Sequence, residues 1–173
     1  MTTLHRVTTE YIEAEDRLRL SGEDASGGTV VAWLTQRLMN RLIPHLCQWL
    51  EKQAAPTPPA GPTPLAGLKQ EFAQQKARAE LEPQPPVKAR PEGRSVLVHG
   101  VQLKSSQSRV TLLFKDAADE VTAVLQLQAP PLRQWLNILY DHYLRAGWAT
   151  AVWPQWMAEA RAAQASGPAS VLH

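Results

Sequence analysis

The stretch "DRLRLSGEDASGGTVVAWLTQRLMNRLIPHLCQWL", Asp16–Leu50, contains the pattern that decides the fold. Residues 17–20 alternate polar and apolar side chains, which predicts a half-buried strand. Ser21–Gly28 holds three glycines and predicts a turn. Residues 29–34 form a continuous apolar run rich in β-formers, which predicts a second strand buried on both faces. Val7–Ala14 is predicted to be a further strand before this hairpin.

A helix is predicted to follow the second strand. The hydroxyl of Thr35 is placed to cap it by accepting a hydrogen bond from a free backbone N–H. Pro44 lies within the helical pattern and predicts a kink or a loosened first half. Apolar side chains recur at three- and four-residue intervals and form one stripe. They are Leu38, Leu42, Leu46, Trp49 and Leu50.

The same order of elements recurs in "SRVTLLFKDAADEVTAVLQLQAPPLRQWLNILYDHYL", Ser108–Leu144. Aligning the strands pairs residues 92 positions apart, and two additional residues near 128–131 shift the helices to 94. Ser95–Leu103 is predicted to be the matching first strand, and Gly147 to end the second helix. The alignment pairs the strand and turn residues Leu18, Asp24, Val31 and Trp33 with Val110, Asp116, Ala123 and Leu125, and the helix residue Leu38 with Leu132.

Both faces of the predicted strands carry apolar side chains, so one helix cannot cover them. Val31 and Trp33 point to one face, whereas Val30, Ala32 and Leu34 point to the other. Each half is also near the size at which a single core becomes marginal. We therefore predict an α+β fold of two β-β-β-α repeats. The repeats would form a pseudo-twofold antiparallel sheet unit with helices packed on it, either as one six-stranded sheet or as two halves packed face to face.

The predicted domain organisation has four parts. A first repeat spans residues 1–53 and a second spans 95–147. Residues 54–94 hold most of the fourteen prolines and are predicted to be a Pro-rich linker with a possible docking helix at 64–81. That helix carries a thin apolar stripe and would either dock or fluctuate. A Trp-containing extension is predicted over residues 148–173.

Composition and charge favour a protein of the cytoplasm. Eighteen basic and sixteen acidic residues give a net charge of +2, which is far from the basic balance typical of duplex binders. The single cysteine, Cys47, excludes an internal disulfide framework and fits a reducing compartment. The first residues have no apolar signal segment, and no apolar run approaches the length of a membrane span. No contact with a membrane is therefore expected.

No catalytic, cofactor or metal motif is present in the sequence, so we predict a protein that is not an enzyme and has no cofactor. The glycine-rich phosphate loops, the nucleophile elbow and the zinc-protease helix motif are all missing. Among potential ligands, His45 and Cys47 diverge on a helix and cannot bind one metal ion together. Cys47 lies near the apolar stripe, which favours a buried and unreactive thiol.

The residues predicted to bind a partner are aromatic. Trp148, Trp153 and Trp156 lie outside the repeats near a proline and a methionine, a composition typical of interface anchors. Closing a corner of their own domain explains them equally well. Phe72, on the possible docking helix, is a further candidate. These residues lead to the expected function, an interaction or accessory protein that binds a protein partner or self-associates through apolar sheet and Trp surfaces.

A possible anion or nucleic-acid patch consists of Arg17, Arg19, Arg37 and Arg41. The order of sheet and helix in each half is similar to the plan of the Whirly and PC4-like single-strand binders, whose curved sheets take bases on aromatic and basic side chains. Each predicted half is one strand short of that plan, and no motif residue transfers. Single-stranded nucleic-acid binding is therefore the alternative function.

Overall fold

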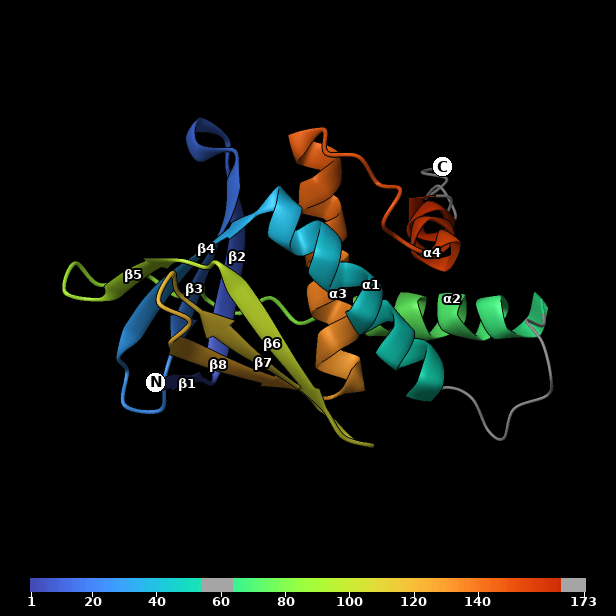
Figure 1. Ribbon diagram of the computed structural model, residues 1–173. Helices are drawn as coiled ribbons and strands as arrows, with labels where there is room; N and C mark the ends of the chain where they lie inside the picture. Colours follow the sequence, from blue (N-terminus) through green and yellow to red (C-terminus); the bar gives the residue numbers. More distant parts are fainter. Residues whose placement is uncertain (54–63, 166–173) are drawn as a thin grey trace.

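The computed structural model describes residues 1–53 and 64–165, which form an α+β fold with four α-helices and two mixed sheets of four strands each (Figure 1). The strands in chain order are β1 (Thr2–Leu4), β2 (Arg6–Ile12), β3 (Arg17–Glu23), β4 (Thr29–Thr35), β5 (Arg94–Leu97), β6 (Gly100–Ser105), β7 (Val110–Lys115) and β8 (Val121–Leu127). The helices are α1 (Gln36–Gln53), α2 (Pro64–Ala79), α3 (Ala129–Ala146) and α4 (Gln155–Ala165), and a short 3-10 turn, Glu13–Glu15, joins β2 to β3.

The two sheets exchange strands between the halves of the chain. One sheet has the order β2-β3-β4-β5, and the other has the order β1-β8-β7-β6. β5, which begins the second half, pairs in parallel with β4 of the first half. β1, which begins the first half, pairs in parallel with β8 of the second half. The predicted antiparallel sheet unit is confirmed in part: three strands of each sheet pair in antiparallel fashion, and each sheet closes with one parallel strand from the other half.

The exchange also corrects the predicted first strands. The strand predicted over Ser95–Leu103 is two strands, β5 and β6, which belong to different sheets. The strand predicted over Val7–Ala14 ends at Ile12, because residues 13–15 form a 3-10 turn, which Asp16 ends in the left-handed conformation (φ 46°). β1, at only three residues, is too short to show an alternating pattern.

The turns of the two halves make the same hydrogen bonds. Oδ1 of Asp24 accepts from the backbone N–H groups of Ser26 and Gly28, and Oδ1 of Asp116 accepts from those of Ala118 and Glu120. Each aspartate N–H also donates to the carbonyl four residues later, at 2.9 Å and 3.1 Å. These bonds hold each turn in the same Asx-type geometry.

A β-bulge next to the second turn shifts the correspondence between the halves by one residue. The bulge lies between Phe114 and Lys115. Leu18 pairs with Leu34 across the first hairpin, whereas Val110 pairs with Leu127 across the second. The alignment of Trp33 with Leu125, and of Val31 with Ala123, is therefore one residue out of register, since Leu125 and Ala123 lie in the core and Trp33 lies half-exposed on the outer face.

One continuous core joins both halves. The buried cluster contains the inward faces of β4 and β7, namely Val30, Ala32, Leu34, Val110, Leu112 and Phe114. α1 contacts β6 of the second half, and α3 contacts β2 of the first half. Figure 1 shows both helices lying against the same side of the pair of sheets, with α2 and α4 beyond them. The helix of each half thus packs on a strand of the other half.

Local signals set the ends of these helices. Thr35 Oγ1 accepts from the N–H of Leu38 at 3.2 Å, as the predicted cap requires. Prolines occupy the first turn of α3, and Gly147 ends it in the left-handed conformation (φ 69°) with its N–H donated to the carbonyl of Leu144. α1 is continuous through Pro44.

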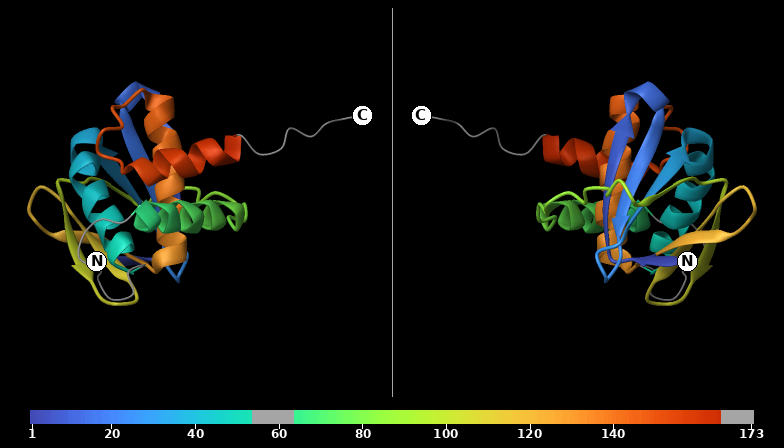
Figure 2. Two further views of the ribbon diagram at one scale, coloured as in Figure 1. Left: turned by 90° about the vertical axis from the view of Figure 1, so that its right-hand side faces the viewer. Right: turned by 90° about the vertical axis from the view of Figure 1, so that its left-hand side faces the viewer.

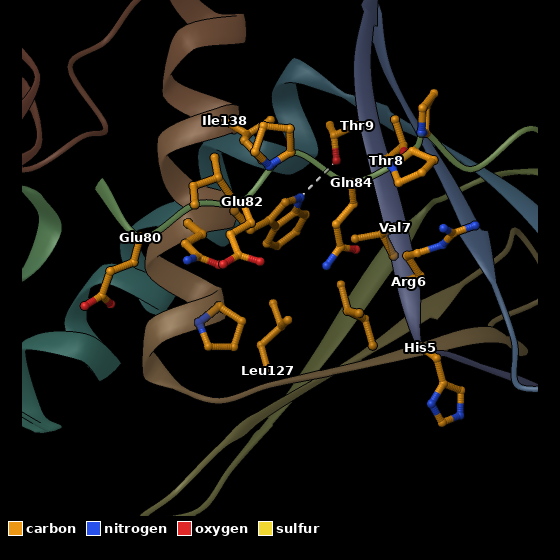
Figure 3. A pocket seen from close by; sticks show the side chains of 18 of the residues that line it. His5, Arg6, Val7, Thr8, Thr9, Glu80, Glu82, Gln84, Leu127 and Ile138 are labelled. Atoms are coloured by element: carbon orange, nitrogen blue, oxygen red, sulfur yellow. Dashed lines mark hydrogen bonds between the residues drawn. The ribbon is translucent and has the colours of Figure 1, made fainter. Parts of the chain in front are cut away.

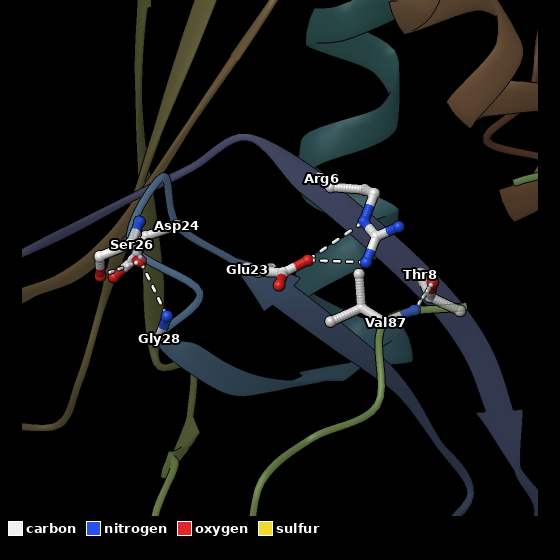
Figure 4. A network of polar contacts seen from close by, with 7 residues as sticks. All are labelled: Arg6, Thr8, Glu23, Asp24, Ser26, Gly28 and Val87. Atoms are coloured by element: carbon white, nitrogen blue, oxygen red, sulfur yellow. Dashed lines mark hydrogen bonds and ion pairs between the residues drawn. The ribbon is translucent and has the colours of Figure 1, made fainter. Parts of the chain in front are cut away.

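Residues 80–91, here called the Pro-rich strap, run across the outer face of the first sheet. The N–H of Val87 donates to Thr8 Oγ1 at 2.9 Å, and the N–H of Arg90 donates to Thr29 Oγ1 at 2.9 Å. Val87 is a buried residue of the strap, and Arg6 pairs with Glu23 at 2.7 Å beside it (Figure 4). The predicted linker therefore contains an ordered segment, whereas its residues 54–63 lie outside the described residues.

The strand exchange predicts that a substitution in the three-residue strand β1 lowers the stability of the whole fold. Leu4 of β1 is buried, and a Cβ on Gly22 would lie 2.6 Å from its Cδ1, so Leu4 fills the space between the two sheets. We expect Leu4→Ala to lower the free energy of unfolding by about 2–4 kcal/mol, measured by urea denaturation. Thr3→Ala, on the exposed side of the same strand, should change it by about 0.5 kcal/mol or less. Equal effects of the two substitutions would show that β1 does not join the sheets.

Candidate functional site

The three tryptophans predicted to anchor a partner are buried within the chain. The Trp148 and Trp153 rings each lie edge-on to the Tyr143 ring, with centroids 5.1 Å and 5.3 Å away. Trp148 Nε1 donates to Asp16 Oδ1, and Trp156 Nε1 donates to Glu51 Oε1. The rings attach α4 and the loop before it to the core. Of the two alternatives that the sequence leaves open, this placement matches the closing of their own domain.

The four arginines of the predicted anion patch lie on two elements. Arg17 and Arg19 are half-buried on β3, whereas Arg37 and Arg41 are exposed on α1. Arg19 pairs with Glu10 at 2.8 Å, and Arg17 lies 3.7 Å from Glu15. The carboxylates therefore neutralise the strand half of the patch.

Phe72 is the predicted partner residue that the structure places in solvent. Together with Leu65 and Leu68 it forms a row on one face of α2, because positions i, i+3 and i+7 lie one above the other on a helix. The exposed fractions of Leu65, Leu68 and Phe72 are 57%, 44% and 60%, and these three side chains are here called the α2 stripe. The predicted docking helix is thus present, but its apolar side chains do not make the docking contact.

α2 docks through its polar side instead. Gln70, Gln74 and Ala77 are buried against α3 and α4, which lie beside α2 (Figure 2). Gln74 Nε2 donates to the backbone carbonyl of Arg133 at 2.8 Å, and Gln70 Nε2 donates to that of Leu50 at 3.5 Å. Two glutamines therefore satisfy backbone carbonyls of α1 and α3. An amphipathic surface helix normally buries its apolar face, so the orientation of α2 is inverted.

The Arg133 guanidinium is the centre of this contact. Its Nη2 donates to Gln70 Oε1 at 2.6 Å, and its Nη1 donates to Gln74 Oε1 at 3.2 Å. The guanidinium carbon lies 5.7 Å from the centre of the Trp156 ring, close enough for a cation–π contact. Arg133 thus joins α2, α3 and α4 at one buried point.

Burial lowers the pKa of Arg133 to about 10, because the charged form is costly away from water. The group still carries its proton at neutral pH and depends on neutral acceptors. Each glutamine oxygen therefore accepts from a buried cation, and removing the cation would leave two buried carboxamide oxygens without a donor.

Asp141 gives a second link among the same helices. Its Oδ2 accepts from Arg78 Nη2 of α2 at 3.1 Å, and its Oδ1 accepts from Arg161 Nε of α4 at 2.7 Å. The Arg133 and Asp141 contacts lie about two helical turns apart on α3. Two separated contacts prevent α2 from rotating about its axis, so the α2 stripe stays in solvent.

The flanks of the α2 stripe differ in charge. Lys69 and Lys76 are exposed along one flank, and Lys76 forms a long ion pair, 3.9 Å, with Glu80. Glu71 and Gln75 are half-buried along the other, where Gln75 Nε2 donates to Glu71 Oε1 at 3.0 Å. The surface around the stripe is therefore basic on one side only.

The titratable groups with large pKa shifts belong to the packed interior. Burial raises the pKa of the Cys47 thiol to about 12, so the thiol is protonated at neutral pH and a poor nucleophile. Within residues 1–53 and 64–165, no group of three or more His, Cys, Asp or Glu side chains has the spacing of a metal site. Over the same residues, no helix combines the length and apolar character that crossing a bilayer requires.

Comparisons with protein-family models, with curated proteins and with solved structures found no match. The geometry of the surface is therefore the basis of the functional conclusion.

The polar docking of α2 can be tested by replacing its central cation. We expect Arg133→Met to lower the free energy of unfolding by about 1–3 kcal/mol, because Gln70 and Gln74 lose a buried partner. Hydrogen exchange of the amides of residues 64–79 should rise more than that of the strands. Arg145→Met, which changes an exposed arginine on the same helix, is the control. Unchanged protection of α2 in Arg133→Met would contradict the role given to Arg133.

Proposed function

We propose that the protein is a non-enzymatic interaction or accessory protein that binds a protein partner through the α2 stripe. The observation that carries this proposal is the inverted orientation of α2, which buries two glutamines and exposes Leu65, Leu68 and Phe72. Exposing three large apolar side chains in a row is unfavourable unless another molecule covers them. The Arg133 and Asp141 contacts support the proposal, because they present the stripe in one fixed orientation before the partner arrives.

The partner is a protein with an apolar groove and an acidic rim. Side chains at i, i+3 and i+7 are the anchors with which an amphipathic helix enters a hydrophobic groove. Lys69 and Lys76 lie along one flank of these anchors and match a rim of opposite charge. A second copy of the chain fits less well, since antiparallel pairing of two α2 helices would place these lysines opposite their own copies.

The proposal includes an internal structural repeat and a cytoplasmic location. The shared hydrogen bonds of the Asp24 and Asp116 turns, and the order of four strands and a helix in each half, support the repeat. Residues 64–91, between the halves, are a docked helix and a strap that bind both halves and present the stripe. The buried free thiol of Cys47 supports a reducing compartment.

We expect the double variant Leu68→Asp, Phe72→Asp to lose partner capture while keeping its fold, because both side chains are solvent-exposed in the free protein. Tagged wild-type and variant chains would be compared by cross-linking in source cells and quantitative mass spectrometry. Leu144→Asp is the matched control, since Leu144 is an apolar residue of α3 that is 41% exposed outside the stripe. The same proteins should be captured by the control and the wild type.

Two results would contradict the protein-partner proposal. One is an identical set of cross-linked proteins for the double variant and the control. The other is a homodimer in sedimentation velocity that dissociates in the double variant, which would make a second copy the occupant of the stripe.

Single-stranded nucleic-acid binding is the second candidate, and the strand count favours it. β1–β4 precede α1 and β5–β8 precede α3. Each half therefore has four strands before its helix, as in the Whirly and PC4-like plan, whereas the sequence predicted three. Trp33 lies opposite Arg19 and Leu97 on the outer face of the first sheet, and its Nε1 donates to Ser95 Oγ at 3.1 Å. A fixed indole on the outer face of a sheet is suited to stacking on a base.

This candidate predicts salt-sensitive binding to oligo-dT, measured by fluorescence anisotropy, that Trp33→Ala weakens by at least about fivefold. Leu113→Ala, a change of a half-buried residue on the outer face of the other sheet, is the control and should bind as the wild type does. No binding at low salt, or equal binding by both variants, would remove this candidate.

A further inference from the structure

A cleft of about 570 Å³ lies at the junction of the two sheets, apart from the α2 stripe. Its walls are the start of β2, the Pro-rich strap, the end of β8 and the first half of α3 (Figure 3). Its volume is within the range typical of ligand sites in proteins. Both halves of the chain thus contribute to one concave surface.

The floor of the cleft is apolar and held in place. Trp135 of α3 is buried there, and its Nε1 donates to Thr9 Oγ1 at 3.0 Å. Leu125 is buried beside it, and Val7 and Ile138 are half-buried in the walls. The Trp135 bond fixes α3 against β2, so the floor is formed before any ligand arrives.

One wall is the open edge of a sheet. β2 is an edge strand, with β3 on its paired side only. The carbonyl of Thr9 accepts from His142 Nε2 of α3 at 2.9 Å, which shows that Thr9 points away from β3. Val7 lies two residues earlier and has the same orientation, since backbone groups alternate along a strand. Within the described part of the chain, the Val7 backbone makes no hydrogen bond to an element outside its own sheet.

The opposite wall offers further peptide-binding groups. The carboxamides of Gln84 on the strap and Gln134 on α3 line the cleft and make no side-chain hydrogen bond to any described residue. Each carboxamide has a donor and an acceptor that match a backbone amide. Figure 3 shows Gln84 drawn between Glu82 and Val7.

Charge is distributed unequally along the cleft. Glu80 and Glu82 lie at the strap end, where Glu82 has no ion pair within the described residues. His5 and Arg6 lie at the other end, and Arg6 is already paired with Glu23. A bound chain therefore meets negative charge at one end only.

We propose that this cleft binds an extended peptide segment that adds to the edge of β2 at Val7, places apolar side chains on the Trp135 floor, and directs a basic residue to Glu82. Backbone pairing at a sheet edge supplies affinity in this recognition mode, and pockets for alternate side chains supply selectivity. This site is separate from the α2 stripe and does not depend on the function proposed for it.

The test uses the blocked peptide Lys-Val-Thr-Val-Thr-Val, the same peptide in reverse order, and versions with Glu in place of Lys. Titration into ¹⁵N-labelled full chain is followed at the Val7 amide and the Trp135 indole. We expect at least one Lys peptide to shift both signals and to bind about fivefold tighter than its Glu version. N-methylation of alternate amides should weaken binding by about fivefold to tenfold, because it removes donors to the strand edge.

Glu82→Lys should reverse the preference, so that the Glu peptide binds tighter than the Lys peptide. Glu92→Lys, an exposed change outside the cleft, is the matched control, and the Leu68→Asp, Phe72→Asp variant should bind the peptides as the wild type does. The proposal is overturned if no peptide shifts Val7 and Trp135, if Glu82→Lys leaves the preference unchanged, or if N-methylation has no effect. The last result would show that the peptide binds without backbone pairing to the edge of β2.

Discussion

The exchange of β1 and β5 between the two halves is the constraint on which the rest of the structure depends. Each sheet ends in a parallel strand from the opposite half, and such pairs need long connections. Neither half can therefore complete its sheet without the other. The side chain of Leu4 is an example: it extends from β1 of one sheet and fills the space above Gly22 of the other sheet. Because the core is formed from both halves, the surfaces between them, including the cleft, are properties of the whole chain.

The segment between the halves is held in the same way, by contacts to both. α2 is fixed on α3 by Arg133 and Asp141, and the strap is fixed on the first sheet by Thr8 and Thr29. A helix with so few apolar residues is marginal alone, so its polar contacts decide whether it forms. Buried polar contacts also select one geometry more strictly than apolar ones, because a misplaced partner leaves a group unsatisfied. This selectivity explains how α2 keeps its apolar side in water.

Local signals in the sequence predicted local structure, while contacts between distant residues could not be predicted. These local signals act within one or two helical turns. α1 begins after Thr35, whose hydroxyl caps it, and α3 ends at Gly147. The leucine spacing of α1 acts over the same short range. β1 has three residues, and its pairing with β8 spans most of the chain, so no pattern in the sequence marks it. The alignment of Trp33 with Leu125 is one residue out of register because the β-bulge of the β7–β8 pair adds one residue, and no feature of the sequence marks it. The tryptophans after Gly147 were open to two interpretations, since a sequence does not show which rings face tyrosines.

The inverted orientation of α2 explains why its role was the hardest to predict. An apolar stripe normally marks the side of a helix that packs, and Gln70 and Gln74 would be assigned to solvent on pattern alone. They pack because Arg133, a cation on a buried face of α3 with no carboxylate partner among the described residues, needs neutral acceptors for its N–H groups. Gln70 and Gln74 supply these acceptors. Because they lie on the side of α2 opposite the α2 stripe, burying them places the stripe in solvent. The conflict between local pattern and tertiary structure is thus located at the surface proposed to bind a partner, where such conflicts are expected to concentrate.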